Sequence, residues 1–296
     1  MLRARQPRNS VALRCLLSLV ALLGLAPRES RAETTASQGR SAALAAQGRH
    51  VYERNCQVCH GRWGDGRGEM ARGMQPRPRR FTAGVFKFRS TPSGFLPTDA
   101  DLERTIRGGL AGSSMPVFGA VLSVGEIAAV IDYLKSFSSK WDRAGNRAPA
   151  LPIPSPPGWF ADAGEVRRHA AAGGPVYAVA CAPCHGTRGR GDGFAAARLE
   201  DDWGEASPPS DLTGPTLRCG PEPDDIYRTL VTGLNGTPMP AFLEATTEIE
   251  RWDLVAWILT ARRERAGIPE EQIPGVRRGP VRGSSRDFSS ERTLRR

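Results

Sequence analysis

The sequence predicts an all-α fold built from two copies of one helical module. Three observations support this prediction. A set of residues recurs at a nearly constant offset, each copy ends in a helix that starts with a capping box, and no stretch alternates apolar and polar residues as a half-buried strand would. The chain has 296 residues, which is enough for two small domains.

The repeat has an early part and a late part in each copy. In the early part, residues of the first copy recur 125 positions later in the second. The residues of the first copy are Gly48, Val51, Tyr52 and 56–61, and their counterparts are Gly173, Val176, Tyr177 and 181–186. In the late part, the offset is 124 and residues 112–118 match residues 236–242. The middles differ, because residues 86–97 are additional in the first copy and residues 201–208 in the second. We therefore expect the same module twice, with different central segments.

Each module is expected to close with a capped helix. Ser123 to Glu126 and Thr247 to Glu250 are capping-box sequences, and each is followed by apolar residues at helical spacing. Shorter helices are expected at 99–107 and 224–231, and further helices before the cysteine pairs at 42–55 and 166–180. In the last of these, Gly173, Gly174 and Pro175 are expected to interrupt the helix.

These elements divide the chain into five segments. They are a signal peptide at 1–32, a first domain at 42–140, a Pro-rich linker at 141–165, a second domain at 166–263 and a basic tail at 264–296. The linker contains five prolines between residues 149 and 157, and this density favours an extended, semi-rigid connector. The tail is rich in arginine and is expected to be solvated and disordered.

The first 32 residues have the pattern of a secretory signal. An Arg-containing start precedes a short apolar stretch at 15–26, and Ser30 and Ala32 are the small residues expected before a cleavage site. No apolar run reaches the length that a multi-span membrane protein needs. We therefore expect export to the periplasm and no transmembrane span after cleavage; an uncleaved anchor is the alternative.

The net charge of +10 does not predict nucleic-acid binding. The segment 1–32 carries six arginines and one acid, a net +5, so the chain after cleavage has +10 − 5 = +5. Much of the remainder lies in the tail. Only three of the 41 basic residues are lysine, so the arginine excess is as consistent with coding bias as with phosphate binding.

Two Cys-x-x-Cys-His motifs, at residues 56–60 and 181–185, indicate which cofactor the chain binds. This pattern is the attachment signature of c-type haem, in which two thiols add to haem vinyl groups and the histidine supplies the proximal iron ligand. A redox dithiol, half of a zinc site or a chance match is the alternative for a single motif, and duplication in an exported chain makes all three weaker. The sequence therefore predicts two covalently attached haems, held by Cys56, Cys59 and His60 and by Cys181, Cys184 and His185.

The sixth iron ligand is predicted to be methionine in both copies. Met115 and Met239 each lie in a Gly-x-x-Met-Pro-x-Phe segment, 55 and 54 residues after the histidine of their module. A thioether is a soft ligand that favours reduced iron. Met70 and Met74 have no counterparts and are expected to be fillers of the core.

Three other residues are weaker candidates. His50 and His169 have no matching histidine in the other copy, so surface or packing roles are expected for both. Cys219 is an unpaired thiol in a segment where the copies do not align, and it is either buried and inert or an alternative haem ligand.

Both halves resemble class I cytochrome c domains, and the whole chain is similar to a periplasmic di-haem cytochrome c. The resemblance covers about 44–138 and 166–262, with a Gly-Asp-Gly at 64–66 and at 191–193 as additional support. It implies that the first and last helices of each domain cross near the haem, with Tyr133 and Trp257 in the last helix. It also implies electron transfer as the default role.

The leading hypothesis is therefore a two-haem electron carrier, not an enzyme, with transient redox donor and acceptor proteins as partners. The haem propionates would reduce the mature charge of +5 to about +1, which removes the remaining support for nucleic acid as a partner. Two alternatives stay open. One is a haem enzyme of the di-haem peroxidase or thiosulfate-oxidising type, with an open position at one iron; the other is the cytochrome subunit of a larger periplasmic oxidoreductase.

Overall fold

The computed structural model describes residues 28–267, with side chains described from residue 41 onward, and its helices form two similar halves. The helices of the first half are α1 (Arg28–Asn55), α2 (Gln57–His60), α3 (Asp99–Gly108) and α4 (Val124–Lys135). Those of the second half are α5 (Ala163–Ala180), α6 (Ala182–His185), α7 (Pro223–Thr232) and α8 (Glu248–Ala266). Short 3-10 turns occur in the intervening loops. Within the described residues there is no strand, only an isolated bridge between Glu200 and Ala206, so the predicted all-α class is confirmed.

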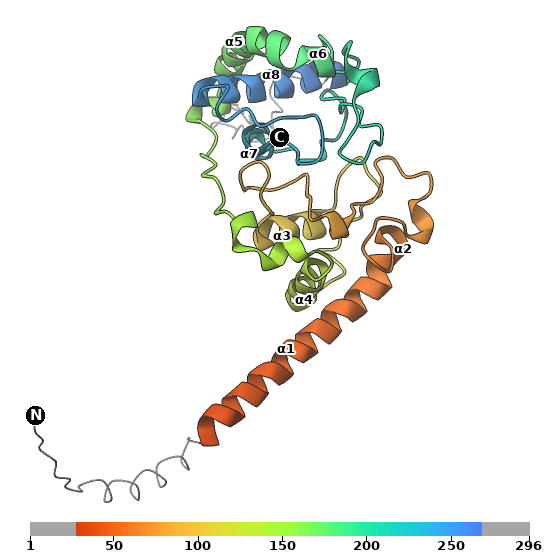
Figure 1. Ribbon diagram of the computed structural model, residues 1–296. Coiled ribbons are helices and arrows are strands. Elements are labelled where there is room, and N and C mark those ends of the chain that lie inside the picture. The colour runs from red at the N-terminus through yellow and green to blue at the C-terminus, as the bar shows by residue number, and fades with distance from the viewer. Residues whose placement is uncertain (1–27, 268–296) are drawn as a thin grey trace, which may run out of the picture.

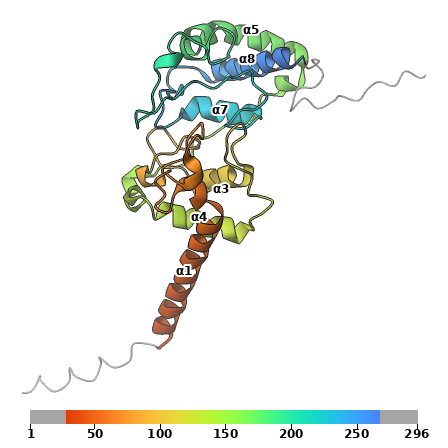
Figure 2. The ribbon, with the colours of Figure 1, turned by 90° about the vertical axis from the view of Figure 1, so that its right-hand side faces the viewer.

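In each half, the first long helix packs against the last. Helix α1 contacts α4, and α5 contacts α8, while α3 and α7 pack against α4 and α8. The two halves lie one above the other, with α3 and α7 towards the boundary between them, and the N-terminal part of α1 projects away from the body (Figures 1 and 2). Each half has its own core of buried apolar side chains. Tyr133 and Trp257 lie in α4 and α8, in agreement with the expectation from the resemblance.

A buried glycine allows each of these helix crossings. A Cβ atom at Gly48 would overlap the carbonyl group of Ala129 in α4, and one at Gly173 would overlap that of Asp253 in α8. The prediction that residues 173–175 interrupt the helix is wrong, because α5 is continuous from Ala163 to Ala180 with Pro175 inside it. Packing of α5 along α8 outweighs the local helix-breaking tendency of these residues.

The capping boxes form as predicted. The side chains of Ser123 and Thr247 accept hydrogen bonds from the third residue of α4 and α8, and the glutamates at those positions bond back to the caps. Helix α3 has a third box, in which Thr98 pairs with Asp101. Each box satisfies backbone donors at a helix start, where no intrahelical partner exists.

The segment between the halves contributes to both cores. Trp141 is 6% exposed within the first core and Phe160 is 4% exposed within the second, while Leu151 donates its backbone N–H to the carbonyl of Ser90 at 2.8 Å. The predicted signal segment lies mostly outside the described residues, and α1 already includes Ala32, the expected cleavage position. The predicted tail lies outside them from residue 268 onward. No helix of residues 28–267 is both long and apolar enough to cross a membrane.

Candidate haem-binding site

The cysteines and the histidine of each motif are placed by a sharp helical turn. The backbone N–H of His60 donates to the carbonyl of Cys56, and that of His185 donates to the carbonyl of Cys181, both at 2.8 Å. Gly61 then leaves the helix with a φ of 81°, which a residue with a side chain rarely adopts. Because the turn brings the thiols and the imidazole of one motif to the same side of the chain, they can act on one ligand.

Both imidazoles are oriented by a backbone carbonyl. The Nδ1 atom of His60 donates to the carbonyl of Arg79 at 2.9 Å, and Nδ1 of His185 donates to the carbonyl of Ser210 at 3.0 Å. A carbonyl can only accept, so Nδ1 carries the proton and Nε2 keeps a free lone pair. Burial lowers the pKa of both histidines, which favours the neutral form that a metal requires.

The motif thiols are free, and burial favours the protonated form of the first thiol of each motif. All cysteines of the described residues are unpaired. Burial, together with the neighbouring Cys59, raises the pKa of Cys56 to about 12, and burial with Cys184 raises that of Cys181 to about 11. Within the described residues, no group of three or more His, Cys, Asp or Glu side chains is arranged to hold a metal ion, which disfavours the zinc alternative. Protonated thiols suit the haem attachment that the sequence predicts. Addition of an S–H group across a haem vinyl group would need no external oxidant, because the sulfur bonds to one vinyl carbon and the hydrogen to the other.

The two methionine loops have the same construction. Leu110 N–H donates to the carbonyl of Met115 at 3.1 Å, and Met115 N–H donates to Ser113 Oγ at 3.2 Å. In the second half, the corresponding bonds join Leu234 with Met239 at 3.1 Å and Met239 with Thr237 at 3.3 Å. Each loop is therefore held by its own hydrogen bonds, and a proline directly after the methionine restricts it further.

The loop entrances also require glycine. Gly109 and Gly233 have φ values of 62° and 65°, and a Cβ atom on either would meet the backbone of the proline that follows the methionine. These glycines therefore bring each methionine loop close against the end of α3 or α7.

All eight predicted haem residues line one continuous cavity of about 330 Å³. Its other walls are largely apolar and come from both halves. The eight residues are Cys56, Cys59, His60, Met115, Cys181, Cys184, His185 and Met239. Thiols, a neutral imidazole and a thioether in an apolar cavity are the donor set that fits a c-type haem in each half, and the haem would supply one-electron redox chemistry there.

Sequence reasoning missed the role of two tyrosines. Tyr52 and Tyr177 are buried, and their hydroxyl groups donate to the carbonyls of Gly61 and Gly186 at 2.6 and 2.7 Å. They connect the helix before each motif to the residue directly after the histidine. The repeat had already marked both tyrosines, but it could not show what they bond.

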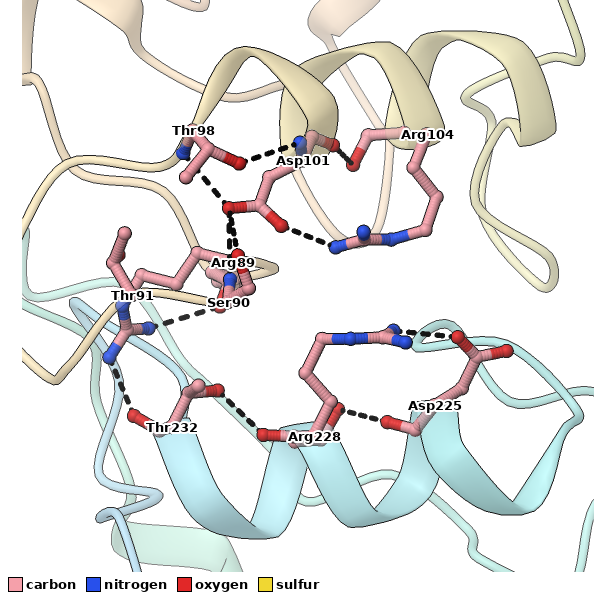
Figure 3. A network of polar contacts seen from close by, with 12 residues as sticks. Arg89, Ser90, Thr91, Thr98, Asp101, Arg104, Asp225, Arg228 and Thr232 are labelled. Atoms are coloured by element: carbon pink, nitrogen blue, oxygen red, sulfur yellow. Dashed lines mark hydrogen bonds and ion pairs between the residues drawn. The ribbon is translucent and has the colours of Figure 1, made fainter. Parts of the chain in front are cut away.

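The segments in which the copies differ form the boundary between the halves. Arg89, in the additional segment 86–97, is 1% exposed, and its guanidinium donates to the carbonyls of Thr232 and Gly233 at 2.5 and 3.2 Å. Figure 3 shows this bond reaching from the first half to the end of α7. In the same region, Asn235 accepts from Gly94 N–H at 2.9 Å.

The additional segment of the second half makes the reciprocal contact. Trp203 lies under the guanidinium groups of Arg79 and Arg80, with 4.7 and 5.4 Å to the ring centroid. Glu205 pairs with Arg77 at 3.5 Å. Further along the boundary, equivalent ion pairs face each other from α3 and α7, namely Asp101 with Arg104 and Asp225 with Arg228 (Figure 3).

The three weaker candidates of the sequence analysis are His50, His169 and Cys219. His50 is exposed, and His169 bonds Asp253 at 2.6 Å and stacks on Trp159 at 3.7 Å, as expected for surface and packing roles. Burial raises the pKa of the Cys219 thiol to about 11, which disfavours a thiolate ligand.

The two methionines without counterparts differ from each other. The expectation that Met70 fills the core is wrong, because this side chain is 55% exposed. Met74 lines the cavity. Neither methionine lies in a hydrogen-bonded loop like those of Met115 and Met239.

Comparisons with known proteins agree with this arrangement. The family model of the cbb3-type cytochrome c oxidase subunit III matches the chain twice, at residues 43–134 and 168–258. Among solved structures, a chain of the reducing HAO-like protein complex of Kuenenia stuttgartiensis is similar, with 39% sequence identity and a TM-score of 0.67 over 73% of this chain and 95% of that chain. A search of curated proteins found no significant match.

The two family matches coincide with the two structural halves. Each matched segment contains one Cys-x-x-Cys-His motif, and each also contains the methionine loop of its half. Cytochrome c domains of this family imply c-type haem as the cofactor. The chain therefore belongs to the cytochrome c family of the cbb3-type oxidase subunit III and consists of two such domains in tandem.

Proposed function

We propose that this protein is a periplasmic di-haem cytochrome c that transfers single electrons between redox partners. Two covalently bound haems would be held by the cysteine pairs, by His60 and Met115 in the first half, and by His185 and Met239 in the second. The observation that carries the proposal is that both halves present the same thiols, neutral imidazole and methionine loop to one common cavity.

With an imidazole and a thioether as the protein ligands, neither iron would have an open position for a substrate. The protein would then contribute the choice of ligands, exclusion of water by the apolar walls and a fixed separation of the two centres. Because residues of both halves line one common cavity, two haems bound there would have no intervening layer of protein core between them, which would suit electron transfer from one to the other.

The first experiment counts haems and tests for an open iron position. The chain is expressed in a host that attaches c-type haem and exports the protein. We expect two haems per chain that resist acid–acetone extraction, and no ready carbon monoxide binding by the reduced protein without denaturant. A colourless protein contradicts the proposal, whereas ready binding at one haem favours the enzyme alternative.

A second proposal concerns assembly. The similar solved chain comes from a protein complex, so we infer that this cytochrome serves as the electron-transfer subunit of a larger oxidoreductase. The haem-loaded chain, tagged in its native organism, should elute in an assembly of fixed stoichiometry, well above its own 32.0 kDa. Its haems should be reduced or reoxidised when the substrate of that assembly is added. Elution as a monomer with no such response contradicts the subunit role.

A further inference from the structure

Three cationic side chains from the two halves meet in the wall of the common cavity. Arg79 and Lys87 belong to the first half and Arg218 to the second, and all three line the cavity. Burial lowers the pKa of Lys87 to about 8, and the charges of Arg79 and Arg218 act in the same direction, whereas Asp201 acts against them. Lys87 is therefore within electrostatic reach of cations from both halves.

The two arginines of this group each have a buried donor without an acceptor. The Nη1 atom of Arg79 and the Nε atom of Arg218 are buried without a hydrogen-bond partner. Among the side chains that the structure describes, no carboxylate lies within ion-pair distance of any of the three cations. The nearby Asp201 is already engaged, because its Oδ1 accepts from the backbone N–H groups of Trp203 and Glu205.

Partly buried guanidinium groups without an ion-pair partner are costly, and proteins normally pair them. The expected occupant is therefore an anion with several acceptor oxygens. The remaining cavity wall is largely apolar, so the occupant should combine an apolar body with an anionic end. A haem has this chemistry, since its ring is apolar and its two propionate groups are carboxylates.

We propose that Arg79, Lys87 and Arg218 form one carboxylate site that binds propionate groups of the haems of both halves and thereby couples the two redox centres. This proposal rests on the proposed function, because it needs two haems. Each cation would then stabilise the reduced, less positive state of both irons. Loss of one cation should lower both midpoint potentials, including that of the haem in the other half.

The arrangement of the histidine contacts supports this sharing. The carbonyl of Arg79 accepts from His60, and Arg218 donates from Nη1 to the hydroxyl of Ser210 at 3.3 Å, while the carbonyl of Ser210 accepts from His185. Arg79 in the first half and Arg218 in the second therefore each lie beside the backbone carbonyl that orients the histidine of that half. Substitution of the Arg79 side chain leaves its backbone carbonyl in place, so the variant does not remove the support of His60.

The test is a redox titration with optical spectra of the haem-loaded protein and its R79Q, K87Q and R218Q variants. We expect R79Q and R218Q each to lower both potentials, R218K to retain the wild-type values, and R143Q, which removes an exposed arginine charge outside the cavity, to change neither. Titration in a Met239→His background assigns the two steps to the two haems. Carbon monoxide binding and haem content, measured in parallel, identify any variant that has lost its native ligands.

Three outcomes would overturn the shared site. The first is a shift confined to the haem of the mutated half, and the second is a shift no larger than that of R143Q. The third is a dependence of the wild-type midpoint potentials on added inorganic phosphate, which would show that a free anion, and not a propionate group, binds Arg79, Lys87 and Arg218. Failure of the proposed function is separate, because it would appear as fewer than two haems in the wild-type protein before any variant is compared.

Discussion

At the scale of single residues, each methionine loop holds its sulfur by contacts within the loop. The hydroxyl of Ser113 accepts from Met115 N–H and donates to the carbonyl of Leu110 at 2.7 Å, and Thr237 bonds in the same way in the second half. A loop fixed in this way pre-positions a soft donor, so little ordering is required when an iron binds. A thioether in this position stabilises ferrous iron relative to ferric iron.

Replacement of either loop methionine should alter one haem without releasing it. In M115A or M239A we expect both haems to remain attached, because the cysteines are unchanged. The affected haem should have a lower midpoint potential and should bind carbon monoxide readily. Optical redox titration and carbon monoxide difference spectra measure both effects. M74A, which changes another methionine of the cavity wall, and M70A, which changes an exposed one, are the controls. Release of covalent haem from M115A would contradict the assigned role.

At the scale of secondary-structure elements, the two helix crossings depend on close backbone contact. Gly48 in α1 and Gly173 in α5 occupy equivalent positions of the repeat, and at each the neighbouring helix lies where a Cβ atom would be. The two nearest atoms at each glycine are backbone atoms, which cannot rotate away as a side chain can. A larger residue must therefore separate the helices and open the core.

G48A and G173A should each destabilise the protein by about 3 kcal/mol, at the upper end of the cost of overpacking, despite the better helix propensity of alanine. The matched control is G125A in α4, where no atom lies within 4 Å of the new Cβ atom. That variant should be neutral or more stable by up to about 1 kcal/mol. Denaturant unfolding of the haem-loaded proteins measures the difference. Equal stabilities for G48A and G125A would show that the crossing tolerates a side chain.

At the scale of the whole molecule, the two halves are joined by polar contacts that the internal symmetry does not generate. Arg89 places its charge against the carbonyl end of α7, where the helix dipole favours a cation. Asn235 binds the backbone at Gly94 and donates to the carbonyl of Phe95 at 3.2 Å. Because segments 86–97 and 201–208 each reach the opposite half, the arrangement of the two halves depends in part on residues that only one copy possesses.

R89M should loosen this junction, and it also removes two bonds within the first half, which Arg89 donates to the carbonyls of Lys87 and Pro92 at 3.3 Å. The variant leaves the carbonyl of Thr232 without its donor, at a cost of about 1–3 kcal/mol, whereas the carbonyl of Gly233 still accepts from the Thr232 hydroxyl at 3.1 Å. We expect the thermal unfolding of the haem-loaded protein, followed by calorimetry, to change from one transition to two. R143M at the exposed surface should leave the transition unchanged. A single transition at the wild-type midpoint in R89M would show that the junction does not depend on this arginine.

Much of the haem site was predictable because its signals are local. The spacing of cysteines and histidine, the two capping boxes and the methionine segments each depend on residues a few positions apart, and duplication made each signal more specific. The interruption predicted at Gly173 to Pro175 was wrong because local propensity was weighed without the packing of α5 on α8. The hydroxyl bonds of Tyr52 and Tyr177 were missed because no spacing rule predicts them.

The sequence alone therefore determined that two similar helical modules each carry a haem-attachment motif and a methionine segment. Such patterns follow from covalent spacing and helix geometry, which a chain carries before it folds. Only the tertiary structure decided that both motifs open into one cavity and that Arg79, Lys87 and Arg218 meet in its wall. These residues are separated by more than 100 positions between the halves, and their proximity results from packing at a boundary that has no periodic pattern in the sequence.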